Sequence, residues 1–140
     1  MTGFQQVAIT KNQSKAYTLV PTLESQVLYY QKTIENVVSC TGIGVHSGMP
    51  VTVTLYPAVS GSGITFVRTD LGETEILAHW QAVMDTRQCT TIGNGPKATV
   101  STIEHLMAAL AANSVDNLRI EINGPELPIM DGSAKPFMEL

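Results

Sequence analysis

The sequence predicts an α+β protein, a single two-layer domain in which a mixed or antiparallel sheet of about five strands packs on one full helix and a truncated second helix. Two observations support this fold class. Short segments of alternating apolar and polar residues, typical of strands, recur along the chain, whereas only one stretch has the apolar spacing of a full helix. At 140 residues and 44% hydrophobic, the chain is also long enough to bury one ordinary core.

Composition divides the chain near residue 31. Residues 1–30 are rich in Gln, Ser, Thr and Lys without a sustained period, which predicts a loosely ordered N-terminal extension. From residue 31, short segments with the residue pattern of strands follow one another, so residues 31–140 are expected to form the domain.

The expected strands follow in order from residue 32. In the second strand, Val51, Val53 and Leu55 alternate with threonines between two prolines, as in a strand with one buried face. Asn94-Gly95 is typical of a tight hairpin turn and is expected to join the fifth and sixth strands. The expected ranges are 32–40, 51–56, 64–68, 76–80, 88–92, 98–100 and 117–122.

One full helix is expected over residues 102–112. On a helical wheel, its larger apolar residues form one stripe that would pack on the sheet, namely Ile103, Leu106, Met107 and Leu110. Glu104 and His105 lie off this stripe, on a side otherwise made of the small residues Ala108, Ala109, Ala111 and Ala112.

A second helix is expected near the end of the sequence, with Ser133 as its N-cap and Pro136 in its first turn. Only about one turn follows this cap, and so short a helix is marginal by itself. We therefore expect that the helix is cut short and that the natural protein, or a partner, continues it.

Composition also bears on partners and location. The formal net charge is −4 and no cluster of Lys and Arg appears, which argues against a nucleic-acid binder. No apolar run of about 18 residues predicts a membrane span, and residues 1–30 lack the features of a secretory signal. Cys40 and Cys89 follow no C-x-x-C spacing, so we expect reduced thiols in a cytoplasmic protein, with a disulfide between them left open.

Glu104 and His105 are the most informative pair for chemistry. A carboxylate beside an imidazole is half of a zinc hydrolase site, and a helix N-terminus favours a nearby anion. A capping box, Ser101-x-x-Glu104, explains the glutamate equally well without any chemistry. Catalytic zinc needs three protein ligands, and neither His46 nor His79 has a local spacing with His105. The pattern alone leaves both interpretations open.

Two other segments are weaker candidates for a site. The glycine-rich segment 42–48 matches neither a dinucleotide-binding motif nor a P-loop, and a tight strand connection explains it more simply. His46, at its tip, is a candidate for ligand contact. Cys89 has polar neighbours and either lines a cleft or is an inert buried thiol.

Five ordered motifs together resemble a known family. They are Thr41 to Gly48, Asp85-Thr86 with Cys89-Thr90, Ser101 to Leu106 leading to Ala108 to Leu110, Val115 to Asn117, and Pro128 to Ala134. With these motifs, Gln31 to Leu140 resembles the N-terminal domain of UDP-3-O-acyl-N-acetylglucosamine deacetylase, a zinc enzyme of lipid A biosynthesis in Gram-negative bacteria.

The resemblance implies roles for five residues. His105 would ligate the catalytic zinc and Glu104 would act as general base. Zinc would lower the pKa of a bound water towards about 7, and the resulting hydroxide would attack the 2-acetamido carbonyl of UDP-3-O-acyl-N-acetylglucosamine, releasing acetate and the free amine. Val45 and Cys89 would lie near the substrate passage, and His46 near the site.

The resemblance also implies what this chain lacks. The family fold consists of two similar domains packed helix layer to helix layer, and only the first is matched; the other zinc ligands, the catalytic acid and the acyl-chain tunnel belong to the second. We therefore expect an isolated chain that is inactive and binds zinc weakly. The second domain, or a self-associating copy, would cover its exposed helix face. The alternative is a non-catalytic binding or structural module that retains the fold.

Overall fold

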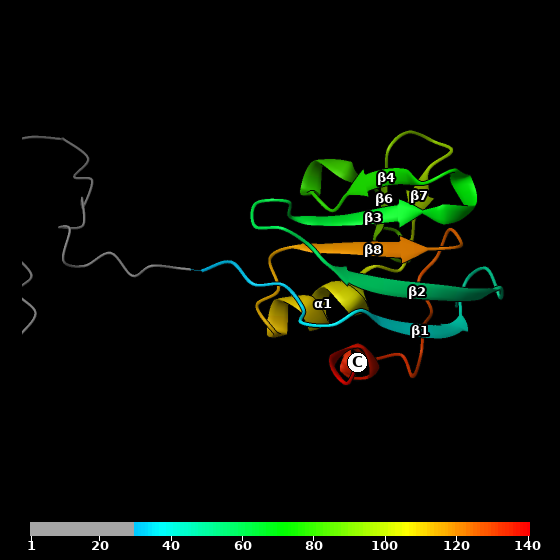
Figure 1. Ribbon diagram of the computed structural model, residues 1–140. Coiled ribbons are helices and arrows are strands. Elements are labelled where there is room, and N and C mark those ends of the chain that lie inside the picture. The colour runs from blue at the N-terminus through cyan, green and yellow to red at the C-terminus, as the bar shows by residue number, and fades with distance from the viewer. Residues whose placement is uncertain (1–29) are drawn as a thin grey trace, which may run out of the picture.

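The computed structural model describes residues 30–140, so the N-terminal extension expected over residues 1–30 lies outside the described residues except for Tyr30 (Figure 1). The strands are β1 (Val38–Ile43), β2 (Pro50–Pro57), β3 (Ile64–Arg68), β4 (Thr74–Leu77), β5 (Val83–Asp85), β6 (Thr91–Gly93), β7 (Thr99–Val100) and β8 (Leu118–Ile122). The helices are α1 (Glu104–Ala112), α2 (Lys135–Met138) and two short 3-10 turns, η2 (Thr69–Leu71) and η3 (Trp80–Ala82). In this described part, no helix is long and apolar enough to cross a membrane.

Five strands form one mixed sheet in the order β1-β2-β8-β3-β4. Neighbours run antiparallel except β3 and β8, which are parallel and therefore need a long crossover between them. That crossover carries a second sheet, β5-β6-β7, and helix α1. The predicted α+β class, with a five-stranded mixed sheet and two helices, is confirmed.

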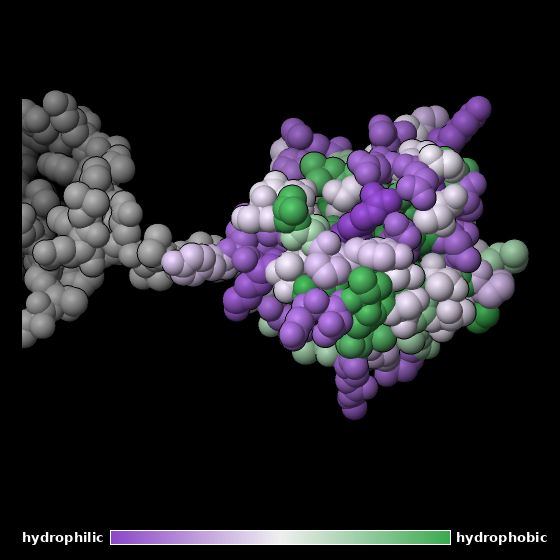
Figure 2. Space-filling view, in the orientation of Figure 1, coloured by the Kyte–Doolittle hydropathy of each residue, from purple (hydrophilic) through white to green (hydrophobic). Residues whose placement is uncertain are grey.

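The core lies on one face of the large sheet. The alternating apolar residues of β2 and β8 point to this face, and their cluster includes Leu106 of α1, Ile92 of β6 and Val100 of β7. Helix α1 and the small sheet therefore cover the same side of the large sheet (Figure 1). The other face carries polar residues such as Thr54 and Arg119, and the view in Figure 2 is largely hydrophilic or neutral with smaller apolar areas.

Several predicted strand boundaries were wrong. The first strand begins at Val38 instead of residue 32, because the backbone of Lys32 instead bonds to Asp116 and Asn117. The fourth ends at Leu77, since the chain then turns into η3, where the imidazole of His79 accepts a hydrogen bond from the Gln81 amide. The short strand β5 and the separate small sheet were missed. The ranges 64–68 and the hairpin at Asn94-Gly95 are confirmed.

The capping-box interpretation of Ser101-x-x-Glu104, left open by the sequence, is excluded by the contacts. The Ser101 amide donates to the carbonyl of Pro125, and Glu104 Oε2 instead accepts from the Thr90 amide at 3.0 Å. Ala109, expected on the open side of the helix, is buried with Leu106 and Leu110. The open side of α1 is therefore narrower than the helical wheel suggested.

The second helix begins at Lys135, so its N-cap position lies one residue after the predicted cap, Ser133. Ala134 precedes α2, yet Ser133 Oγ accepts a hydrogen bond from the Lys135 amide at 3.1 Å, as an N-terminal cap does. Pro136 lies in the first turn, as expected. Helix α2 packs on α1 and buries Phe137 in the core.

A buried arginine connects the two sheets. Arg68, on β3, is 5% exposed, and its Nη1 donates to the carbonyl of Thr99 on β7. Its Nε and Nη2 bind the carboxylate of Asp70 at 2.8 and 2.7 Å. A buried charge is tolerated only when it is paired and hydrogen-bonded, and these contacts satisfy that need.

Candidate functional site

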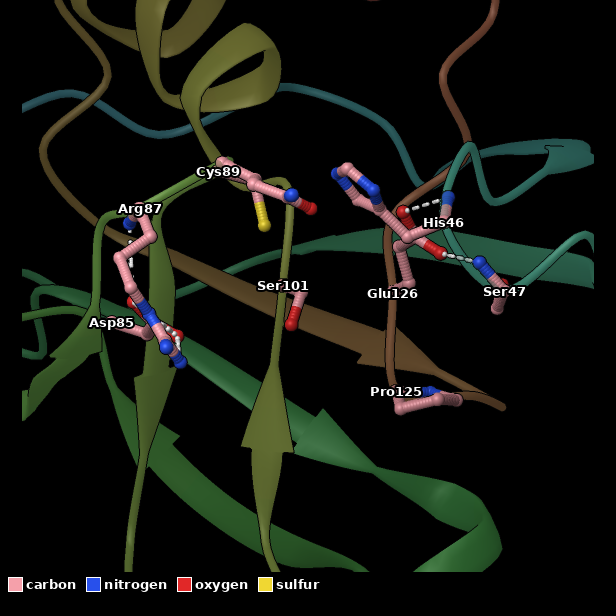
Figure 3. A pocket seen from close by; sticks show the side chains of 9 residues that line it. His46, Ser47, Asp85, Arg87, Cys89, Ser101, Pro125 and Glu126 are labelled. Atoms are coloured by element: carbon pink, nitrogen blue, oxygen red, sulfur yellow. Dashed lines mark hydrogen bonds and ion pairs between the residues drawn. The ribbon is translucent and has the colours of Figure 1, made fainter.

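A pocket of about 550 Å³ opens where three separate segments meet (Figure 3). The first is the glycine loop, residues 42–48, which follows β1. The second is the irregular segment 85–89 between β5 and β6. The third consists of residue 101, three residues before α1, and residues 125–126, which follow β8. The lining residues are His46, Ser47, Asp85, Arg87, Gln88, Cys89, Ser101, Pro125 and Glu126.

The glycine loop folds around a carboxylate of its own chain. Glu126 is 4% exposed, and its two oxygens accept hydrogen bonds from the amides of His46 at 2.9 Å and Ser47 at 2.8 Å (Figure 3). Consecutive amides that point at one anion form a concavity that elsewhere binds phosphate. Here Glu126 fills that concavity, so the glycine loop does not serve as a phosphate cradle.

A third donor completes the environment of Glu126. The hydroxyl of Thr102 donates to Oε1 at 3.1 Å. Burial by itself raises the pKa of a carboxyl, but the hydrogen bonds from His46, Ser47 and Thr102 outweigh it and hold the pKa of Glu126 below its ordinary value. Glu126 is therefore ionised at neutral pH, and its oxygens accept hydrogen bonds.

The opposite wall of the pocket carries an ion pair. Arg87 Nη2 lies 2.7 Å from Asp85 Oδ2, and the hydrogen bonds from the Arg87 side chain hold the pKa of Asp85 well below its usual range. The Arg87 side chain is largely exposed, so this pair contributes little to stability. Cys89 lies between the ion pair and α1, with its Sγ 3.7 Å from the hydroxyl of Thr91.

Helix α1 begins beside this pocket with unusual backbone geometry. Thr102 has a φ of 58°, a left-handed conformation that costs a β-branched residue about 1–3 kcal/mol. The turn at Thr102 starts the helix so that Glu104 faces back towards segment 85–91, where the Thr90 amide holds its Oε2. Glu104 and His105 are both half-buried.

The structure brings only two of the five predicted site residues together. His46 and Cys89 line the pocket, and in Figure 3 their side chains point into it from different segments. Val45 is 53% exposed and lies outside the lining. Glu104 and His105 also lie outside it, although Glu104 accepts a hydrogen bond from the amide of Thr90, the residue that follows Cys89.

The described residues do not by themselves fit a catalytic zinc ion. Nowhere in residues 30–140 do three or more His, Cys, Asp or Glu side chains gather as a metal site. Zinc in a catalytic site needs three protein ligands. His105 can provide one imidazole nitrogen, so a zinc site here would need ligands from elsewhere.

Sequence reasoning missed Glu126, a pocket side chain whose carboxylate joins three other residues. It lies in an otherwise apolar segment between Pro125 and Pro128, and a single carboxylate in such surroundings must find partners if it is buried. That signal was present in the sequence. Its partners were not, because they lie 80, 79 and 24 residues away.

The fold and the pocket define an α+β domain that presents a carboxylate–imidazole pair at a helix start. Residues 31–140 match the family model described as LpxC, UDP-3-O-acyl N-acetylglycosamine deacetylase. The chain therefore belongs to this deacetylase family.

Three curated relatives, all named UDP-3-O-acyl-N-acetylglucosamine deacetylase, illustrate the likeness. The protein of Anaeromyxobacter sp. (strain Fw109-5) is 54% identical over 108 residues, which are 77% of this chain and 35% of the relative. Those of Myxococcus xanthus and Tolumonas auensis are 53% and 49% identical, covering 80% and 79% of this chain and 36% of each relative. The chain thus spans about a third of the length of these relatives.

Proposed function

We propose that this chain takes part in zinc-dependent deacetylation of UDP-3-O-acyl-N-acetylglucosamine, giving the free amine and acetate, a step of lipid A biosynthesis in the cytoplasm of a Gram-negative bacterium. Family membership supports the reaction class, and the adjacent Glu104 and His105 at the start of α1 support the residues. The observation that carries the proposal is the position of Glu104. A carboxylate kept for capping would bond to the Ser101 amide, yet Glu104 bonds to Thr90 instead.

Glu104 is proposed to act as the general base. Its Oε2 is held by the Thr90 amide, which leaves Oε1 to accept a proton from a water molecule. The fixed rotamer aims the carboxylate before substrate arrives, which reduces the entropy lost in the reaction. His105, next along the helix, would contribute one metal-ligand nitrogen. Zinc, when bound, would supply a water of lowered pKa and a positive charge opposite the developing oxyanion.

His46, Val45 and Cys89 are proposed to contact substrate. His46 and Cys89 line the pocket, Glu104 bonds to the residue after Cys89, and Val45 is an exposed apolar side chain on the same glycine loop as His46. This arrangement suits a substrate that passes from an apolar contact at Val45 towards the start of α1. Because the amides of His46 and Ser47 are already occupied by Glu126, the diphosphate is expected to be bound by other groups.

We infer that the active protein needs further residues. The chain covers about a third of its relatives' length, and its described residues provide one candidate zinc ligand where a catalytic site uses three. A second domain, or a second copy, would also cover the exposed alanines of α1, which are Ala108, Ala111 and Ala112. Light scattering on the purified chain tests the second possibility, since a clean monomer would exclude a self-associating copy.

The proposal is tested by reconstitution. The chain is co-expressed with the part of the Anaeromyxobacter relative that it does not match, and zinc content and acetate release are measured. We expect turnover and stoichiometric zinc from the pair and neither from the chain alone. Turnover and full zinc content from the chain alone would overturn the need for further residues.

Two variants and a matched control test the assigned residues in the same assay. Glu104→Gln and His105→Ala should each remove activity, and His105→Ala should also reduce zinc content. Glu121→Gln is the control, because Glu121 lies on the opposite face of the large sheet and is held by Arg119. A reconstituted protein that folds but never deacetylates would instead favour a binding or structural module.

A further inference from the structure

Glu126 lies between the two parts of the chain that carry the candidate site residues. On one side, its carboxylate receives the amides of His46 and Ser47 from the glycine loop. On the other, it receives the hydroxyl of Thr102, two residues before Glu104. With three donors, the buried carboxylate bridges the glycine loop and the start of α1.

The backbone reinforces the same connection. Residues 101 and 126 form a parallel β-bridge. The Ser101 amide donates to the Pro125 carbonyl at 2.9 Å, and the Leu127 amide donates to the Ser101 carbonyl at 3.0 Å. The segment that carries Glu126 is thereby fixed to the chain that leads directly into α1.

Near Glu126 the backbone is strained at one residue and closely packed at another. Thr102 is 3% exposed and left-handed, although threonine disfavours that conformation. Gly44 leaves no room for a side chain, because a Cβ there would come within 2.4 Å of Glu126 Oε2 and 2.3 Å of Ser47 Oγ. Strained backbone that persists beside a pocket is typical of functional sites.

We propose that Glu126 is a positioning residue that sets the glycine loop, with His46, against the start of α1, with Glu104 and His105. Its relevance to catalysis rests on the proposed deacetylase function. A carboxylate suits this position better than a neutral amide, since three residues donate to it and the single oxygen of an amide offers fewer acceptor sites than two carboxylate oxygens.

The experiment uses amide resonances and hydrogen exchange of the 140-residue chain, without zinc or substrate. In Glu126→Gln, the side-chain NH₂ replaces one acceptor, so the amides of His46 and Ser47 should exchange about ten-fold faster or more. The amides of Thr90 and His105 should also shift, because the start of α1 loses its anchor. Glu121 is a carboxylate on the opposite face of the sheet, so Glu121→Gln should change neither the glycine-loop amides nor those of Thr90 and His105.

Thr102→Val provides the reciprocal measurement and keeps the test valid if Glu126→Gln does not fold. It removes one donor to Glu126 while keeping the shape of the side chain, and it should shift the amides of His46 and Ser47 across the bridge. The proposal is overturned if Glu126→Gln moves the glycine-loop amides alone, or if Thr102→Val leaves those amides unchanged. Because no activity is measured, failure of the reconstitution assay would not produce either result.

Discussion

At the scale of single residues, hydrogen-bond partners decide between interpretations that spacing cannot separate. Glu104 is the example, because its position three residues after Ser101 fits a capping box and its contacts exclude one. Glu126 is the opposite case, because no sequence motif marks it and yet its carboxylate accepts hydrogen bonds from three residues. In both cases the partner lies in another part of the sequence, so local pattern carries no information about it.

The Glu104→Gln variant should separate folding from chemistry. The amide oxygen of glutamine can still accept the Thr90 hydrogen bond, so the unfolding midpoint in urea should stay close to that of the unsubstituted chain. In the reconstituted protein, loss of the base should lower kcat by about 10²–10⁴-fold. A variant with normal stability and full kcat would exclude Glu104 as the base.

At the scale of elements, the glycine loop is shaped by what packs against it. Gly44 donates its amide to the Met49 carbonyl, and Gly48, with a φ of 64°, closes the turn by donating to the Gly44 carbonyl. Only the second glycine is required by its backbone angle. The first is required by Glu126, which comes too close to admit a side chain.

Gly44→Ala should therefore destabilise the domain by steric conflict. The new Cβ would push the Glu126 carboxylate away from its donors, and such overpacking costs about 1–3 kcal/mol in the free energy of unfolding. Gly124→Ala is the matched control, because its nearest neighbour would be Val51 Cγ2 at 3.4 Å, an ordinary contact. Urea unfolding measures both, and equal stability of the two variants would contradict the close packing at Gly44.

At the scale of the whole molecule, the two sheets depend on a buried ionic contact. Arg68 extends from the large sheet to the Thr99 carbonyl of the small sheet and is neutralised by Asp70. The small sheet carries the chain into segment 85–89 and α1, so this contact places the pocket wall as well as the core. Its strength depends on the charge of Asp70.

Acid should weaken this contact in a defined direction. The hydrogen bonds from Arg68 hold the pKa of Asp70 below its ordinary value, so its stabilisation is fully present above the unfolded-state pKa of about 4 and is lost as pH falls through the folded-state pKa. Asp70→Asn removes the counter-charge of the buried Arg68 but keeps one amide oxygen as an acceptor, so it should lower the free energy of unfolding by about 1–3 kcal/mol at pH 7. The difference between the two proteins should shrink below pH 4 in urea unfolding curves. A difference that does not change with pH would contradict the ionic contribution.

Replacing Arg68 should also destabilise the domain, because it removes the contact between the two sheets. Arg68→Met keeps much of the side-chain volume but leaves the Thr99 carbonyl without its donor, and an unsatisfied buried acceptor costs about 1–3 kcal/mol. Thermal unfolding should show a loss of this size. An unchanged unfolding temperature would indicate that the contact between the sheets contributes little.

The amino-acid pattern was sufficient for those features that depend on neighbours in sequence. Alternation in β2 and β8, the Asn94-Gly95 hairpin and the apolar stripe of α1 follow from side-chain period and turn chemistry. The five motifs likewise indicated the family before any contact was known. Predicted strand boundaries were wrong where residues distant in sequence supplied the hydrogen bonds. The backbone of Lys32, for example, bonds to residues 116 and 117, and the first strand begins later than predicted.

Tertiary structure alone determined how the pieces of the site meet. The pairing of Glu104 with Thr90, the entry of His46 and Cys89 into one pocket, and the burial of Glu126 between the glycine loop and α1 all join segments far apart in sequence. The physical reason is that a buried polar group takes whichever partner the packed chain brings within hydrogen-bonding distance. Periodicity predicts which face of an element is buried, but it does not predict what that face meets.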